Sequence, residues 1–193
     1  MDWLADLVAR FVVGADDTAL AQRQILALDA GGETAARGFL EVCRLVGEAA
    51  TDRTGLVSAL DDLGNGDVLA RIGALVVGSF AAVRADYPAR PDAQAARARI
   101  AARAEDILEE AGGAFGADVH QFLQRLAGEA IMQVSAIAAN RAPLVRVETG
   151  LSLPSSALAW DLYGDPSRGE ELVARNRSGT PLLMPTRLEA LAN

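Results

Sequence analysis

Apolar residues recur every three or four positions through most of the chain, a spacing that predicts amphipathic helices. The pattern is clearest after Asp67, a predicted N-cap, and after Asp118, which with Gln121 resembles a capping box. The run from Gly112-Gly113 through Gly116 predicts a break between two of these helices.

The first predicted helix covers Trp3 to Phe11, and the second follows a cap at Asp16 or Asp17 and holds Leu20 and Ile25. The next two run from about Glu33 to Ala50 and from Thr54 to Leu63. The helix after Asp67 closes at Tyr87-Pro88, another opens at Pro91-Asp92 and carries its stripe to Ala111, and the helix that starts at Asp118 ends before Pro143.

A different pattern begins near residue 142. Leu144–Glu148 alternates apolar and polar residues, which is typical of a short strand. Two short helices follow, and a final run at 188–191 predicts a returning strand. The predicted fold is therefore mainly α, with a helical region over 1–141 and a small α+β module, ordered strand, helix, helix, strand, over 142–193.

Local signals place the ends of the two short helices. Pro154 suits a helix start, and Ser155 or Ser156 is expected to cap it. Gly164 favours the left-handed conformation that ends a helix. Glu171 is expected to pair with Arg175, one turn further along the second helix.

Charge narrows the range of partners. The net charge is −8, and all 18 basic residues are arginine. Nucleic acid and anionic membranes both favour a basic surface, so the acidic balance argues against either as a partner. The absence of lysine excludes a P-loop or a Schiff-base lysine. The apolar run at 68–83 is shorter than a typical membrane span and contains Arg71, which favours a buried helix.

Residues that carry chemistry are sparse, and no catalytic, metal-binding or cofactor-binding residue is predicted. His120 is the single histidine and has no metal-ligand spacing around it. Cys43 lies on an apolar helical face, which favours a buried thiol. Adjacent acids such as Glu170 and Glu171 point about 100° apart on a helix and do not form an acid–base pair. The chain is expected not to be an enzyme.

One string near the C-terminus is distinctive in combination. It comprises Leu153-Pro154, Leu158-Ala159, Leu162-Tyr163-Gly164-Asp165 and Glu171-Leu172-Val173-Ala174-Arg175-Asn176. In this order and spacing it resembles the C-terminal region of the DNA circularization proteins of Mu-like phages and prophages, which are tail and baseplate assembly proteins. The strand, helix, helix, strand order is also similar to a LysM module. The sequence departs from the family pattern at Trp160 and Asp161, and the separate N-terminal domain of longer members is not recognisable.

This resemblance implies a structural component of a contractile phage tail or phage-like particle, made in the bacterial cytoplasm and located in the virion. Its LysM-like module would join hub or tube proteins to the wedge, in a symmetric assembly of several copies. The residues implied to bind a partner are Leu153, Pro154, Trp160, Tyr163, Gly164, Asn176 and Arg177. An alternative is a peptidoglycan-binding module on a helical stalk, and a third hypothesis is a cytosolic helical regulator.

Overall fold

The computed structural model describes residues 1–192, and within them the fold is mainly helical with a two-stranded sheet. The chain divides into two compact units, each described by itself below. The first comprises residues 1–86 and 93–137, and the second comprises residues 87–92 and 138–193. The coarse prediction of a mainly α fold is confirmed.

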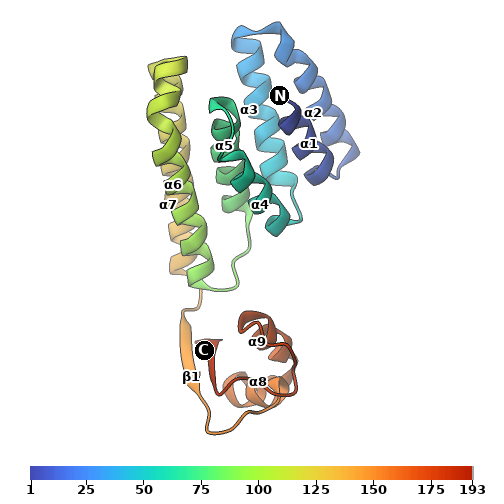
Figure 1. Ribbon diagram of the computed structural model, residues 1–193, viewed down its shortest axis with the longest axis vertical. Helices are drawn as coiled ribbons and strands as arrows, with labels where there is room; N and C mark the ends of the chain where they lie inside the picture. Colours follow the sequence, from blue (N-terminus) through green and yellow to red (C-terminus); the bar gives the residue numbers. More distant parts are fainter. Residues whose placement is uncertain (193) are drawn as a thin grey trace. The chain divides into compact units, whose positions relative to one another are not determined.

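Helices make up the first unit (Figure 1). They are α1 (Asp2–Phe11), α2 (Ala15–Ala27), the short 3₁₀ helix η1 (Leu28–Ala30), α3 (Gly32–Ala49), α4 (Arg53–Leu63), α5 (Val68–Arg84), α6 (Arg90–Phe115) and α7 (Ala117–Ala139).

Close packing of α3 against α5 forms the centre of this unit. On α3, Val42, Cys43 and Val46 are fully buried, and Leu75 of α5 is also inaccessible. A Cβ added at Gly47 would lie 2.7 Å from the carbonyl oxygen of Val77. Because a real Cβ does not approach an oxygen that closely, the absence of a side chain at residue 47 is what lets the two backbones come together.

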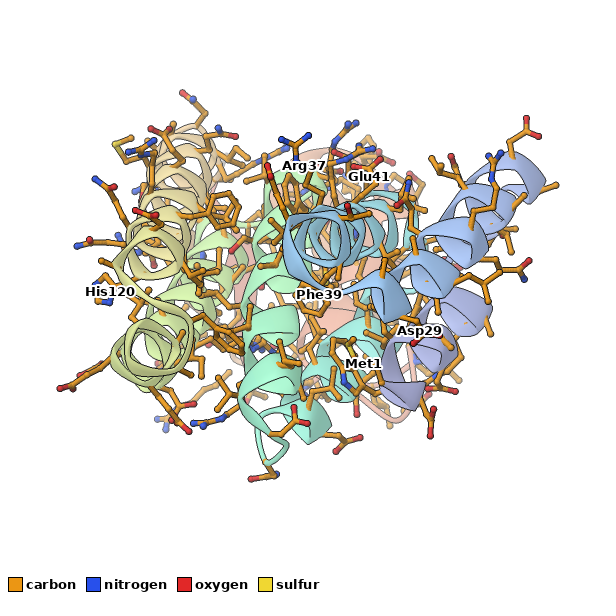
Figure 2. All side chains as sticks on the ribbon, turned by 90° about the horizontal axis from the view of Figure 1, so that it is seen from above. Met1, Asp29, Arg37, Phe39, Glu41 and His120 are labelled. Atoms are coloured by element: carbon orange, nitrogen blue, oxygen red, sulfur yellow. The ribbon has the colours of Figure 1, made fainter. Side chains whose placement is uncertain are left out.

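The face of α3 that carries Phe39 also contacts the N-terminal helix. Trp3 and Phe39 meet edge to face, with 6.0 Å between ring centroids. Figure 2 shows Phe39 directed into the space between the helices, whereas Arg37 and Glu41 of the same helix lie on its outer side. This separation of apolar and polar sides is what the three-four spacing predicts.

Two of the helix starts are held by aspartate side chains. Asp67 accepts a hydrogen bond from the Ala70 N–H at 2.8 Å, so the predicted N-cap is confirmed. Asp52 accepts in the same way from the Gly55 N–H at 2.9 Å. Asp118 instead lies inside the first turn of α7.

The predicted break from Gly112-Gly113 through Gly116 is confined to its last residue. α6 continues through Gly112 and Gly113 to Phe115, and the chain turns at Gly116, which has φ of 96°. Gly112 lies against His120 of the next helix, where an added Cβ would be 2.9 Å from Nδ1. Gly112 therefore serves the close approach of α6 and α7 rather than ending a helix.

Ion pairs hold α6 on the helices before it. Arg71 of α5 binds both Asp106 and Glu110 of α6. Arg103 of α6 donates to Asp61 of α4 at 2.7 Å. Both arginine side chains are mostly covered, at 18% and 16% exposure, while the carboxylates are open to solvent. The acidic side of these pairs thus lies at the surface of the unit.

The second unit contains a small sheet and two helices. Its elements are β1 (Leu144–Glu148), α8 (Ser155–Tyr163), the 3₁₀ helix η2 (Pro166–Arg168), α9 (Gly169–Arg175) and β2 (Arg187–Leu191). The strands are antiparallel, with Arg146 opposite Glu189 and Val147 opposite Leu188. Figure 1 shows β1 on one side of this unit and the helices on the other.

The core of the second unit is formed by residues from α8, α9, β2 and the loop before it. Its fully or nearly fully buried members are Leu158, Ala159, Leu172, Met184, Leu188 and Ala190. Val147 is the contribution of β1 and is partly buried against this cluster. The alternation of β1 and β2 thus turns one face of the sheet toward the helices and the other toward solvent.

The short segment Tyr87–Asp92, which the sequence placed with the helical region, belongs to the second unit. The Arg90 N–H donates to the Ala142 carbonyl at 2.9 Å. Arg175 of α9 lies 3.8 Å from the Asp92 carboxylate. These contacts join residues far apart in the sequence, so no local pattern indicates them.

No helix within residues 1–192 combines the length and the apolar character needed to cross a membrane. The apolar run of α5 is instead a buried helix of the first unit, as predicted: Ile72, Ala74, Leu75 and Val76 are each at most 4% exposed.

We expect Gly47→Ala to lower the free energy of unfolding of the helical unit by about 1–3 kcal/mol, because the new methyl group pushes α3 away from the backbone of α5. Gly128→Ala is the matched control, since nothing lies within 4 Å of a Cβ added there in the middle of α7. It should raise stability by about 0.5–1 kcal/mol through helix propensity. Urea unfolding followed by circular dichroism measures both, and equal effects of the two changes would contradict this view of the α3–α5 contact.

Cys43 should resist alkylation in the folded protein. It is completely buried, and this burial raises the pKa of the thiol far above its ordinary value, so no reactive thiolate forms near neutral pH. Iodoacetamide at pH 8, followed by mass spectrometry, should leave the native chain unmodified and label the chain in urea completely. Fast labelling without urea would show that this part of the core opens readily.

Candidate partner-binding surface

The outer edge of β2 is closed by the side chain of Asn176, the C-cap of α9. Its Nδ2 donates to the carbonyl oxygens of Glu189 and Leu172, each at 2.9 Å. Its Oδ1 accepts from the Glu189 N–H at 2.7 Å. The side-chain amide thus pairs with Glu189 as a neighbouring strand would, and it ends α9 at the same time. Asn176 therefore satisfies backbone groups at the end of α9 and on β2 together.

Tyr163 closes the next position of the same edge. The Leu191 N–H donates to its hydroxyl oxygen at 3.0 Å, and its ring packs against the buried cluster. The guanidinium of Arg168 covers the ring, with Cζ 3.7 Å from the centroid. The aromatic face is therefore already occupied by a cation, an arrangement that stabilises the turn between α8 and α9.

Gly164 and Asp165 make that turn. Gly164 has φ of 70° and ψ of 10°, the left-handed conformation predicted for the end of α8. Asp165 accepts hydrogen bonds from the Ser167 hydroxyl and N–H, and these bonds lower the pKa of its carboxyl group. Pro166 follows this cap and opens the short 3₁₀ helix η2, after which α9 begins.

Leu153 and Pro154 position the start of α8. Pro154 is the N-cap residue, and Leu153 packs partly against the buried cluster. The predicted cap by Ser155 or Ser156 is wrong, since no side chain caps this helix. Ser155 is buried instead, and its N–H donates to the Pro181 carbonyl at 2.7 Å.

The predicted pair of Glu171 with Arg175 is also replaced by other contacts. Glu171 accepts from Arg168 Nε at 3.1 Å and Nη2 at 2.9 Å. Arg175 instead faces Asp92, at 3.8 Å. Arg168 is recruited because its stack on Tyr163 already holds the guanidinium beside α9.

The seven residues implied by the resemblance thus divide into two groups. Leu153, Tyr163, Gly164 and Asn176 build the unit itself. Pro154, Trp160 and Arg177 are exposed. Trp160 is 61% exposed, and Arg177 holds a left-handed backbone with φ of 49°. Trp160 is the large apolar side chain of this group that the fold leaves at the surface.

Three further exposed leucines were not predicted. Leu151, Leu182 and Leu183 are 72%, 68% and 64% exposed. Their two loop segments lie side by side, because the Met184 N–H donates to the Leu153 carbonyl at 3.0 Å. The sequence signal that could have indicated these leucines is the presence of apolar residues in loops that contain proline and serine. Whether such residues are exposed depends on the tertiary fold.

Hollows occur in both units. The one in the second unit, about 410 Å³, is lined mainly by charged side chains on the solvent face of the sheet and at the end of α9, among them Arg146, Arg177 and Glu189. A hollow in the first unit, about 520 Å³, is lined by apolar residues such as Phe39, Phe115 and Phe122.

His120 is half-buried, with Nδ1 3.0 Å from the Leu108 carbonyl oxygen, and it does not line either hollow. Across residues 1–192, no three histidine, cysteine, aspartate or glutamate side chains gather in a way that suits a metal ion. The arrangement of the second unit instead offers contact surface: exposed apolar side chains around a small, well-fixed core.

No family model matches this sequence, and a search of curated proteins found no match.

Asn176→Ala should destabilise the second unit by about 2–4 kcal/mol, because three hydrogen bonds are lost and the edge of β2 opens. The Glu189 amide should then exchange with solvent faster, which NMR hydrogen exchange measures. Asn65→Ala changes the same residue type in an exposed turn and should alter stability by less than about 0.5 kcal/mol. An unchanged exchange rate at Glu189 would show that Asn176 is dispensable for this edge.

Proposed function

We propose that this protein is a structural component of a contractile phage tail or phage-derived particle, at the baseplate or tail hub. In this role the second unit is a LysM-like module that joins hub or tube proteins to wedge proteins. The protein is then a virion component present in several symmetric copies, without catalytic activity.

The observation that carries the proposal is the place of the phage-like string in the second unit. Tyr163 and Asn176 fix the edge of β2, and Gly164 ends α8, so the string encodes a specific small fold. The strand, helix, helix, strand order agrees with a LysM-like module. A rigid unit of this kind, with its core complete, suits a clip between larger proteins.

Exposed apolar side chains support an assembly role. Trp160 contributes nothing to the buried cluster, and Leu151, Leu182 and Leu183 also remain at the surface. Tryptophan is enriched among the residues that dominate binding energy at protein interfaces. A solvent-exposed tryptophan on a short, well-packed helix therefore favours a protein contact.

The second candidate function is peptidoglycan binding, and the same Trp160 is the observation in its favour. An exposed indole can stack on a sugar ring as well as on a protein surface. Tyr163 is less suited to that task because Arg168 covers its ring. The two functions predict different ligands for one residue.

Trp160→Ala tests the assembly proposal. Tagged chain is expressed in a bacterium that produces the particles, and the particles are purified and analysed by mass spectrometry and cryo-electron microscopy. The unmodified chain should be stoichiometric in the tail or baseplate, and the variant should bind at least about 20-fold more weakly, the effect of losing an interface hot spot. Its unfolding free energy should change by less than about 0.5 kcal/mol, since the side chain is exposed.

Leu26→Ala is the control, because Leu26 is also a large, exposed apolar residue but lies in the helical unit, and this variant should be incorporated normally. Absence of the unmodified chain from purified particles would overturn the assembly proposal. Retention of the chain on isolated peptidoglycan, lost in Trp160→Ala, would support the second candidate instead.

A further inference from the structure

The two-stranded sheet has one closed edge and one open edge. In an antiparallel pair, residues that exchange hydrogen bonds alternate with residues that do not. The Thr149 N–H donates to the Thr186 carbonyl, and the Ala192 N–H donates to the Pro143 carbonyl. With the register of the sheet, this places the N–H and C=O groups of residues 144, 146 and 148 on the side of β1 away from β2.

Those outward groups of Arg146 and Glu148 have no hydrogen-bond partner anywhere in the described residues 1–192. The equivalent groups of β2 are occupied, by Asn176 at Glu189 and by Tyr163 at Leu191. A strand with unpaired backbone groups is a template for another strand. Val145 of β1 is also 40% exposed, so apolar surface accompanies the open edge.

The charged side chains beside this edge are complementary to those of a second copy of the same strand. Arg146 and Glu148 both lie on the solvent face of the sheet, two residues apart. Arg146 forms no ion pair with any residue from 1 to 192, while Glu148 lies 3.1 Å from Arg187. An antiparallel second copy of β1 can therefore place Arg146 opposite Glu148 of that copy, and Glu148 opposite its Arg146.

We propose that β1 pairs with β1 of a second copy of this chain, antiparallel and in the register Arg146 opposite Glu148. The result is a continuous four-stranded sheet with twofold symmetry, β2–β1–β1–β2. Across it each row of solvent-facing side chains alternates in charge. One row reads Arg187, Glu148, then Arg146 and Glu189 of the second copy. The symmetry generates the second row.

Charge selects this register over its neighbour. Pairing Arg146 with Arg146 of the second copy would allow more backbone bonds, but it sets like charges directly opposite each other, which is destabilising. In the proposed register, four backbone hydrogen bonds link residues 146 and 148 of the two copies, and Val147 meets Val147 at the symmetry axis. Opposite-charge cross-strand pairs add to the stability of the sheet.

The charge of the unit also permits self-association. The second unit contains seven arginines and seven acidic side chains, so its formal charge is zero, and the −8 of the whole chain resides in the helical unit. Two copies of the second unit therefore approach without net repulsion. This inference does not depend on the proposed tail function, because it rests on the sheet edge alone.

Charge reversal at each position tests the pairing. Arg146→Glu leaves two glutamates on β1, and Glu148→Arg leaves two arginines, so each variant alone should repel its own copies. A 1:1 mixture should pair again, because every cross-strand pair is then opposite in charge. Sedimentation equilibrium of the full chain, at about 5–500 μM, covers the range expected for a small interface.

The unmodified chain should show a concentration-dependent monomer–dimer equilibrium. The dissociation constant of each variant's dimer should be at least about tenfold higher than that of the unmodified chain. The 1:1 mixture of the two variants should dimerise again. Raising the salt concentration should weaken the dimer, since these charges are exposed. Arg125→Glu and Glu170→Arg reverse exposed charges away from β1 and should dimerise as the unmodified chain does.

A second measurement needs no variant. The amide protons of Arg146 and Glu148 should exchange more slowly at high chain concentration than at low concentration, by NMR. A single-chain mass at every concentration overturns the proposal and leaves the edge to a strand from a different protein. The proposal is also overturned if both variants dimerise as strongly as the unmodified chain. It is equally overturned if both variants fold but their mixture forms no dimer.

Discussion

A two-stranded sheet has two outer edges, and side chains of the second unit close one of them. Asn176 presents an amide to Glu189 in the place of a third strand, and Tyr163 accepts the next free N–H. Because both side chains also belong to helix ends, closing the edge of β2 fixes α8 and α9 against the sheet. The core of Leu158, Leu172 and Leu188 then forms between them.

The same constraint leaves β1 open. The helices lie toward β2, so no side chain reaches the outward backbone groups of Arg146 and Glu148 within the described chain. Trp160 and the loop leucines are exposed on the same unit. The core of this unit is small, so it buries only some of the apolar side chains. The others remain at the surface, where they are available for partners. The capacity of this unit for contact therefore follows from how it is built.

Glycines lie at close contacts between the helices of the helical unit. Gly47 permits the backbones of α3 and α5 to approach, and Gly112 of α6 leaves room for the side chain of His120 on α7. Charged pairs such as Arg103 with Asp61 hold the long α6 in place at the surface of this packing. The unit also carries the whole net charge of the chain, which separates the acidic part of the protein from the neutral part that bears the sheet.

The sequence by itself determined the approximate places of the helices, the strand at Leu144–Glu148, the Asp67 cap and the left-handed Gly164, but not the continuation of α6 through Gly112 and Gly113. Each of these depends on spacing or backbone preference within a few residues. Only the tertiary structure decided which ion pairs form and which strand edge is closed. Asn176 bonds Glu189 across 13 positions, and Tyr163 bonds Leu191 across 28. Such contacts exist only once the chain has closed on itself, so local pattern could not reveal them or the open edge that they leave on β1.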